Sequence, residues 1–131
     1  MDLGVTRAAL DTMLAAAASA APEECCGILL GQQATIERVR PAANVADQRR
    51  HRFEIDPQVL IDAHRAARAG GPSIVGYYHS HPNGSADPSA RDRAEAAHDG
   101  SVWAIVGARG VAFWRDDEDG FVRLSYKVED S

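Results

Sequence analysis

Long apolar runs are missing from this sequence. No segment approaches the ~20 consecutive apolar residues that a membrane-spanning helix needs. The N-terminal stretch from Met1 to Arg7 also lacks the basic segment and apolar core of a secretory signal peptide. We therefore expect a cytoplasmic protein that has no contact with a membrane.

Basic residues are fewer than acidic residues in this sequence. Fourteen lysines and arginines stand against 19 aspartates and glutamates, which leaves a net charge of −5. Phosphate backbones would repel such a chain, so we expect no nucleic-acid partner. The one basic cluster, Arg49, Arg50 and Arg52 around His51, is interpreted as a solvated loop or as a docking patch for an acidic protein.

Cysteine is scarce too, with only the adjacent pair Cys25 and Cys26. Neighbours in a strand point to opposite faces, so the two thiols are not expected to bridge each other. A buried, reduced pair is the expected state in a cytosolic protein. No histidine lies nearby in the sequence to activate either thiol, which disfavours cysteine catalysis.

What is present indicates one globular domain. The chain has 131 residues, of which 45% are hydrophobic and 25% charged, enough to bury a core without disulfides. We expect a single domain over residues 1–131, with the last few residues as a flexible tail. No internal repeat or low-complexity linker interrupts it.

Helix signals recur along the chain. Apolar residues at helical spacing after Thr6, a good N-cap, predict a first helix that ends before Pro22. Asp56-Pro57 predicts the start of a second helix, which Gly70-Gly71-Pro72 would end. A third helix is expected from Ser89 to His98.

Strands are expected where short segments are apolar, β-branched or alternating: 24–31, 34–39, 52–55, 73–80, 102–106, 111–115 and 121–128. The acidic run 116–119 is interpreted as a hairpin loop between the last two. Helices and strands thus alternate in an order that predicts the α/β class, a mixed β-sheet with helices packed on it.

The most informative segment begins where the strand 73–80 ends. His79 and His81 stand two apart, so both imidazoles point to one face and can share a metal ion. Pro82 ends the strand, a short loop follows, and Ser89 opens a helix with Asp92 in its first turn. Two neutral imidazoles and a carboxylate leave a fourth tetrahedral position for water, as in catalytic zinc sites.

Each of these parts also has a purely structural interpretation. An exposed histidine pair is usually ordinary surface. Ser89-x-x-Asp92 resembles a capping box, and Asp92 could simply interact favourably with the positive end of the helix dipole. The combination favours the metal site, because the three parts would place all four groups around one point.

The spacing His79-x-His81-x7-Ser89-x2-Asp92 matches the signature of the JAMM (MPN-plus) metallopeptidases. Residues 22–31 resemble the segment that carries their catalytic glutamate, and the resemblance spans most of the chain. It implies the MPN fold, an α/β sandwich related to cytidine deaminases. It also implies one zinc ion per chain, bound by the two histidines and the aspartate.

The same resemblance implies roles for two further residues. Ser89 would assist the tetrahedral intermediate, and a glutamate would act as general base toward the zinc water. Glu24, two residues before Cys26, aligns with that glutamate and would share a strand face with Cys26 and Ile28. Glu23 would point to the other face and is interpreted as a solvated charge.

The remaining histidines are not expected to bind metal. His64 falls within a predicted helix, His98 falls near a helix C-terminus, where a cation is favoured, and His51 lies in the basic cluster. A cytidine deaminase is disfavoured, because that chemistry needs His-x-Glu and Cys-x-x-Cys, and the chain has neither around His79.

The resemblance also implies a class of substrate. Members of this family hydrolyse peptide or isopeptide bonds after the C-terminal glycine of ubiquitin-like proteins. This compact chain is similar to the short bacterial and archaeal members, some of which process ubiquitin-like sulfur-carrier proteins. Two alternatives stay open: a non-catalytic MPN scaffold, and a zinc peptidase with an unrelated small peptide substrate.

Overall fold

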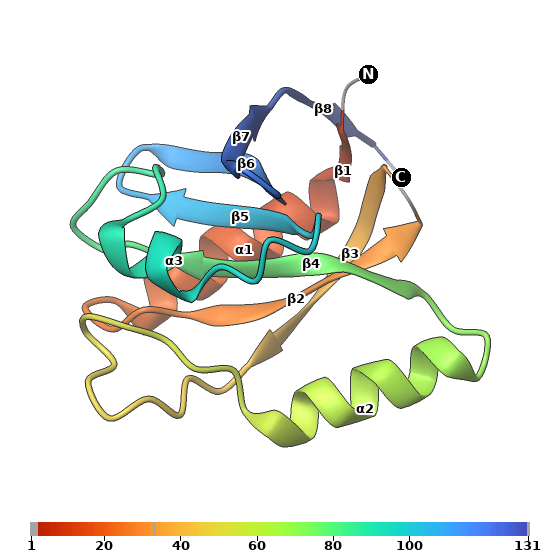
Figure 1. Ribbon diagram of the computed structural model, residues 1–131, viewed down its shortest axis with the longest axis horizontal. Coiled ribbons are helices and arrows are strands. Elements are labelled where there is room, and N and C mark those ends of the chain that lie inside the picture. The colour runs from red at the N-terminus through yellow and green to blue at the C-terminus, as the bar shows by residue number, and fades with distance from the viewer. Residues whose placement is uncertain (1–2, 33, 131) are drawn as a thin grey trace.

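The computed structural model describes residues 3–32 and 34–130, which form one sheet and three helices (Figure 1). The helices are α1 (Arg7–Ala20), α2 (Pro57–Arg68) and α3 (Ala90–Glu95). The strands are β1 (Leu3–Thr6), β2 (Cys26–Gln32), β3 (Thr35–Ala42), β4 (Ser73–Ser80), β5 (Val102–Gly107), β6 (Gly110–Asp117), β7 (Gly120–Leu124) and β8 (Tyr126–Glu129).

The sheet is mixed, as expected. Its strand order is β7-β6-β5-β4-β2-β3-β1-β8. The pairs β4–β5, β1–β3 and β1–β8 are parallel, and the other neighbours are antiparallel. The central strand β4 therefore has a partner on each side, and its C-terminal end carries His79.

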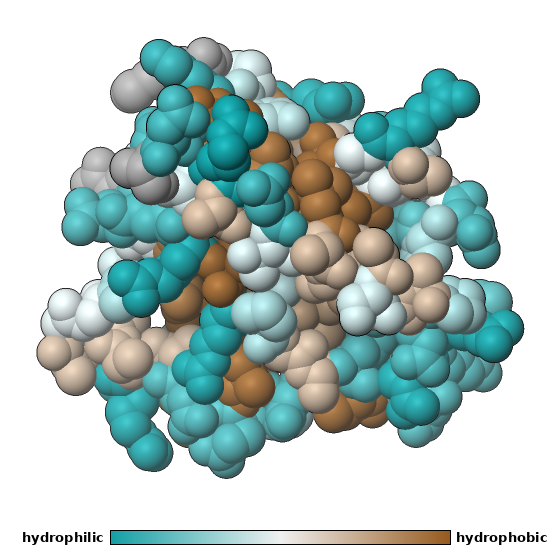
Figure 2. All heavy atoms as spheres, turned by 180° about the vertical axis from the view of Figure 1, so that it is seen from behind, coloured by the Kyte–Doolittle hydropathy of each residue, from teal (hydrophilic) through white to brown (hydrophobic). Residues whose placement is uncertain are grey.

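Helices cover both faces of this sheet (Figure 1). Helix α1 packs on one face over the larger core cluster, which includes Met13, Leu29, Tyr78 and Phe113. Figure 2 looks onto the α1 side, where apolar and weakly apolar residues lie among hydrophilic ones. Helix α2 packs on the other face over a smaller cluster built on Ile28, Leu30 and Ala63. Among the described residues, no helix is long and apolar enough to cross a membrane.

The two edge strands, β7 and β8, are separated by Ser125 alone. The sheet must therefore curl until its edges meet end to end, and the Leu3 N–H donates to the Ser125 carbonyl at 3.1 Å. The predicted single strand 121–128 is thus wrong. Apolar and polar residues do alternate in its sequence, but Val122 and Tyr126 are exposed, and the pairing partner changes from β6 to β1 within the segment.

The helix starts follow the predicted caps. Thr6 accepts from the Ala9 N–H at 3.2 Å, and Asp56 accepts from the Gln58 N–H at 3.0 Å. The third helix is shorter than expected, because it ends at Glu95 rather than at His98. His98 has a φ of +57°, a left-handed conformation that no right-handed helix can contain.

Three further expectations need correction. Strand β1 was not predicted, and residues 52–55 make only an isolated bridge between Asn44 and Ile55. In the acidic run 116–119, Asp116 and Asp117 belong to β6, and only the next two residues form the turn. At the C-terminus, β8 ends at Glu129, one residue beyond the predicted strand; the expected tail falls partly on Ser131, which lies outside the described residues.

Candidate metal centre

His79 is held rigidly at the end of β4. Its side chain is 1% exposed, and its backbone is paired with Cys26 on β2 and with Ile105 on β5. The Phe53 ring stacks on the imidazole with a centroid separation of 4.3 Å, and the Trp103 ring meets it edge-on at 5.7 Å. Burial lowers the pKa of His79, which favours the neutral imidazole that a metal requires.

His81 lies one residue beyond β4 and is oriented by two backbone carbonyls. Its main-chain N–H donates to the Val106 carbonyl at 2.8 Å, and its ring Nδ1 lies 2.8 Å from the Ser85 carbonyl oxygen. A carbonyl only accepts, so Nδ1 carries the proton and Nε2 keeps its lone pair. This outer hydrogen bond is the kind that orients metal-binding histidines.

Asp92 completes the cluster from the first turn of α3. Its carboxylate oxygens lie 3.1 Å from the His79 Nε2 and 3.2 Å from the His81 Nε2. The predicted capping box is confirmed: the Ser89 N–H donates to Asp92 at 2.9 Å, and Asp92 N–H donates to the Ser89 hydroxyl at 3.0 Å. The cap therefore does not compete with the metal-site interpretation, because it fixes the carboxylate against the imidazoles.

The charges in this cluster are strongly coupled. Burial alone would raise the pKa of Asp92, but hydrogen bonds with His79 and His81 outweigh it and hold the pKa well below its usual range. Burial opposes a charge on His81 as well, yet the Asp92 carboxylate and the Ser85 carbonyl raise its pKa. The cluster thus contains a stable anion beside two ring nitrogens.

This donor set is compatible with a metal ion. The ligand atoms of His79, His81 and Asp92 all lie within 4.8 Å of one another, and the two Nε2 atoms are 3.1 Å apart. The buried Asp92 carboxylate is negatively charged, and a cation among the three donors would offset that charge. Two imidazoles and a carboxylate suit a borderline divalent metal.

Glu24 lies beside the cluster, just before β2. It lines a cavity of about 500 Å³ together with His81, and the residue is 9% exposed. Its backbone is fixed by bonds with Arg49 and Asn44. Burial raises the pKa of Glu24 to about 7, although the charge on His81 opposes the rise. Glu23 has a different environment, since it pairs with Arg49 at 3.3 Å.

Ser89 contributes a second polar group near the cluster. Its residue is exposed, and its Oγ accepts the Asp92 N–H. Because that bond uses an oxygen lone pair, the hydroxyl hydrogen is left to donate to another group. The hydroxyl therefore combines a fixed position with an available donor.

The cysteines remain outside this chemistry. Cys25 and Cys26 are both free and buried, as predicted: Cys25, just before β2, belongs to the larger core cluster, whereas the thiol of Cys26, the first residue of β2, faces the Ala42 carbonyl. Burial raises the pKa of both thiols, that of Cys26 to about 12, so neither is a thiolate at neutral pH.

The basic cluster is largely neutralised by carboxylates. Arg49 pairs with Glu23, and Arg52 lies 3.7 Å from Glu95. Arg50 and His51 instead line the cavity that contains Glu24. A docking patch made of all three arginines therefore has less free charge than the sequence suggested.

Several residues that shape the site were missed at the level of sequence. Phe53 and Trp103 hold the His79 ring, and Ser85 orients His81. Ser80 accepts the Cys25 N–H at 2.8 Å and ties β2 to the end of β4. Of these residues, only Ser80 could have been found from the sequence, because it stands between the two histidines on the strand and its side chain must point to the opposite face.

Comparison with known proteins gives a consistent result. Residues 6–117 match the family model Prok-JAB, prokaryotic homologs of the JAB domain. The chain is 37% identical over 118 residues to a desampylase of Haloferax volcanii, covering 86% of this chain and 84% of that protein. It is 38% identical over 94 residues to a probable TtuB-protein conjugate cleaving protease of Thermus thermophilus, covering 72% and 63%.

The fold agrees with this match. A JAB1/MPN domain protein from Archaeoglobus fulgidus superposes with a TM-score of 0.67 at 20% identity, over 98% of each chain. The expected MPN architecture is therefore confirmed. Since the family model spans most of the sequence and the fold matches independently, the chain belongs to the Prok-JAB family of JAMM/MPN domains.

Proposed function

We propose that the chain is a zinc-dependent peptidase or isopeptidase. In this proposal it cleaves the bond after the C-terminal Gly-Gly of a ubiquitin-like, sulfur-carrier type protein in the cytoplasm. One observation carries the catalytic part: His79, His81 and Asp92 converge within 4.8 Å, in a chain whose relatives are named as a desampylase and a conjugate cleaving protease.

In this proposal His79, His81 and Asp92 hold the zinc ion. A zinc ion bound there would supply Lewis acidity toward a carbonyl oxygen and toward water. The protein's part is to fix the three donors before the metal arrives. The Phe53 stack, the Ser85 carbonyl and the Ser89 cap each lock one donor in place.

Glu24 is proposed to be the general base. A carboxylate with a pKa of about 7 can accept a proton from water and return it to a leaving amine near neutral pH. This role is supported by the cavity that Glu24 and His81 both line. Glu23 lacks this environment because it is engaged with Arg49.

Ser89 is proposed to stabilise the oxyanion. A hydroxyl whose oxygen is already bonded to the Asp92 N–H has its direction partly set, and its hydrogen can meet a developing negative charge. Such preorganisation costs little at the moment of reaction.

The substrate part of the proposal can be tested by changing one residue. A carrier protein with a short extension after its Gly-Gly should be cleaved, with the products read by intact mass. Replacing the last glycine by valine should lower kcat/KM by at least ~10²-fold, because a bulky side chain collides where an extended Gly-Gly tail fits. Equal cleavage of both carriers would contradict the ubiquitin-like substrate while leaving a zinc peptidase intact.

A further inference from the structure

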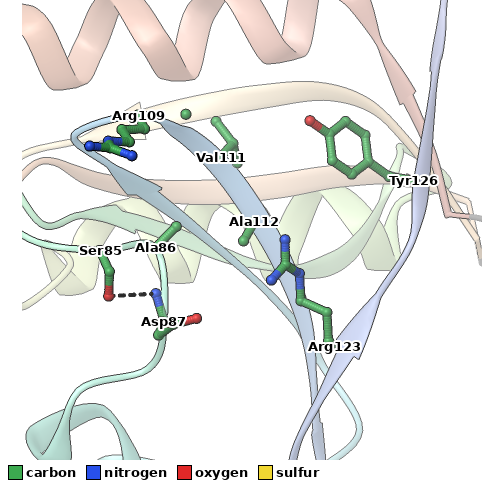
Figure 3. A pocket seen from close by; sticks show the side chains of 9 residues that line it. Ser85, Ala86, Asp87, Arg109, Val111, Ala112, Arg123 and Tyr126 are labelled. Carbon is green, nitrogen blue, oxygen red and sulfur yellow. Dashed lines mark hydrogen bonds between the residues drawn. The ribbon is translucent and has the colours of Figure 1, made fainter.

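A second cavity, of about 590 Å³, is lined by part of the loop that orients His81 (Figure 3). Ser85, whose carbonyl faces the His81 imidazole, also lines this cavity, together with Ala86 and Asp87. The opposite wall is formed by the turn and start of β6, with Arg123 and Tyr126 at the far end (Figure 3). Apart from Ser85, none of these residues has a role in the proposed chemistry.

The cavity is lined by one strand residue, Val111, that has no partner on its outer side. Strand β7 ends at Leu124, which pairs with Phe113, so Val111 has no partner on that side. The pair Gly107–Gly110 closes the β5–β6 hairpin, and hydrogen-bonded pairs alternate along such a ladder. The N–H and C=O of Val111 therefore point away from β5, and no other described segment bonds to them.

Two arginines flank this edge on opposite faces of the sheet. Arg109 also lines the groove beside α1, so it lies on the α1 face. Arg123 lies on the other face, where its guanidinium stands 5.3 Å from the centroid of the Trp114 ring. Within residues 3–32 and 34–130, neither arginine forms an ion pair. With Asp87 as the one carboxylate in the lining, the cavity keeps a net positive charge.

The loop wall of the cavity is fixed in place. The Ala108 N–H donates to the Gly84 carbonyl at 2.9 Å, and the Trp114 Nε1–H donates to the Ala86 carbonyl at 3.0 Å. Gly107 allows close packing, because a Cβ there would lie 2.6 Å from the Ala86 nitrogen. A ligand would therefore meet a preformed site rather than order a loose loop.

We propose that this cavity is a docking site for an extended acidic segment of a partner protein. The segment would add a short strand to the Val111 edge of β6, as peptides do at exposed sheet edges. Successive residues of a strand point to opposite faces. Two consecutive acidic residues would thus reach Arg109 and Arg123 at once.

The proposed function, on which this next step rests, identifies the partner as the substrate. Because Ser85 touches both the cavity and His81, a docked segment would lie beside the metal cluster. Acidic residues near the scissile bond would then add affinity at a site separate from the Gly-Gly tail. The partner is a protein rather than a nucleic acid, since the chain is acidic overall and the cavity itself holds Asp87.

Binding can be tested without any enzymatic assay. The probe is the capped peptide Thr-Val-Glu-Glu-Val-Thr, added to the ¹⁵N-labelled, metal-loaded protein at low salt. We expect the Val111 amide to shift and to exchange with solvent more slowly on binding, because it becomes a ladder donor. The same peptide with Gln-Gln in place of Glu-Glu should bind at least ~5-fold more weakly.

Variants locate the site. Arg109→Ala and Arg123→Ala should each weaken binding about 2- to 5-fold, and the pair about 10-fold. Asp87→Asn should strengthen it, since it removes the opposing charge. Arg115→Ala is the matched control, because this exposed arginine lies on the same strand outside the cavity and should not affect binding.

Two results would overturn the inference. One is an absence of any Val111 response to the acidic peptide in the folded wild-type protein. The other is inorganic phosphate reproducing the full response, which would mean a small-anion site instead of a strand-docking site. A carrier that is cleaved normally although the peptide does not bind would leave the proposed function standing alone. Peptide binding without any carrier cleavage would support the docking site and contradict the proposed function.

Discussion

Two buried aspartates of this molecule, Asp92 and Asp116, both lie beside a histidine, and only one of them belongs to a candidate metal centre. Asp92 is 4% exposed and faces the Nε2 atoms of His79 and His81. Asp116 is fully buried and accepts the main-chain N–H of His98 at 3.0 Å. The His98 ring is only 3.6 Å from its other oxygen.

The two aspartates differ in the number and orientation of the metal-binding side chains around them. The His98 Nδ1 also lies 3.0 Å from the Asp117 carbonyl, so its ring is engaged with a backbone oxygen. Among the described residues, only His79, His81 and Asp92 form a group of three donors. A buried carboxylate beside an imidazole holds a loop, as at Asp116. Two imidazoles that meet one carboxylate, as at Asp92, make a candidate metal site.

The largest expected effect separates the two clusters directly. His81→Ala removes a proposed ligand, so bound zinc should fall from about one equivalent to well below it. Turnover should fall by more than the ~10²-fold that losing an outer partner of a metal ligand can cost. His98→Ala should keep both metal and turnover. Metal analysis and a cleavage assay on both variants check this. Equal metal content in the two variants would contradict the assignment of His81 as a metal ligand.

A second test asks whether burial beside the cluster gives a carboxylate a catalytic role. Glu24→Gln keeps the size of the side chain but removes the base, so it should bind zinc and lose at least ~10²-fold in kcat. Glu23→Gln removes only a partly exposed ion pair and should retain most activity. If Glu23→Gln is the inactive variant, the assignment of the base is wrong.

The third test compares two helix caps. Ser89→Ala and Asp56→Ala each remove an N-cap, which should cost about 1 kcal/mol of stability in either case. Only Ser89→Ala should also slow turnover, by on the order of 10-fold or more, because only that hydroxyl lies at the site. Denaturant unfolding and kcat at matched folded fraction separate the two effects. Similar rates in the two variants would reduce Ser89 to a cap.

The smallest effect concerns the pH dependence of stability in the chelated protein. The pKa of Glu24 is raised in the fold to about 7 from an ordinary value of 4.5. Its protonation therefore stabilises the fold at low pH, and that contribution is lost as the pH rises through 7. Glu24→Gln does not titrate, so at pH 8 it should be more stable than wild type by on the order of 1 kcal/mol. The advantage should shrink as the pH falls below 7 and vanish only below the ordinary pKa of 4.5, as measured by urea unfolding.

Much of this arrangement was predictable because it is encoded locally. The caps at Thr6, Asp56 and Ser89 depend on neighbours within three residues, and all three were predicted. The His79 and His81 pair follows from strand alternation. The assignment of roles to Ser89 and Glu24 came from the family signature, and it stays a prediction.

What was missed depends on distant partners. Strand β1 is a short segment that exists because β3 and β8 pair with it. The alternation of apolar and polar residue types continues through Ser125 in the sequence, so no local pattern marks the break there. Residues 52–55 have the composition of a strand, but Phe53 is used to stack on His79 instead.

The meeting of β1 with β8 has a consequence for how the chain acquires its shape. Leu3 pairs with Tyr126 in parallel register, and Arg7 lies 3.4 Å from Asp130. During synthesis β1 leaves the ribosome long before β8 exists, so it must wait for most of the chain before one of its two neighbours arrives. The histidines and Asp92 lie between them in the sequence and can assemble earlier. Nascent chains halted before β8 should therefore already contain the donor cluster, while their first strand still lacks its outer partner.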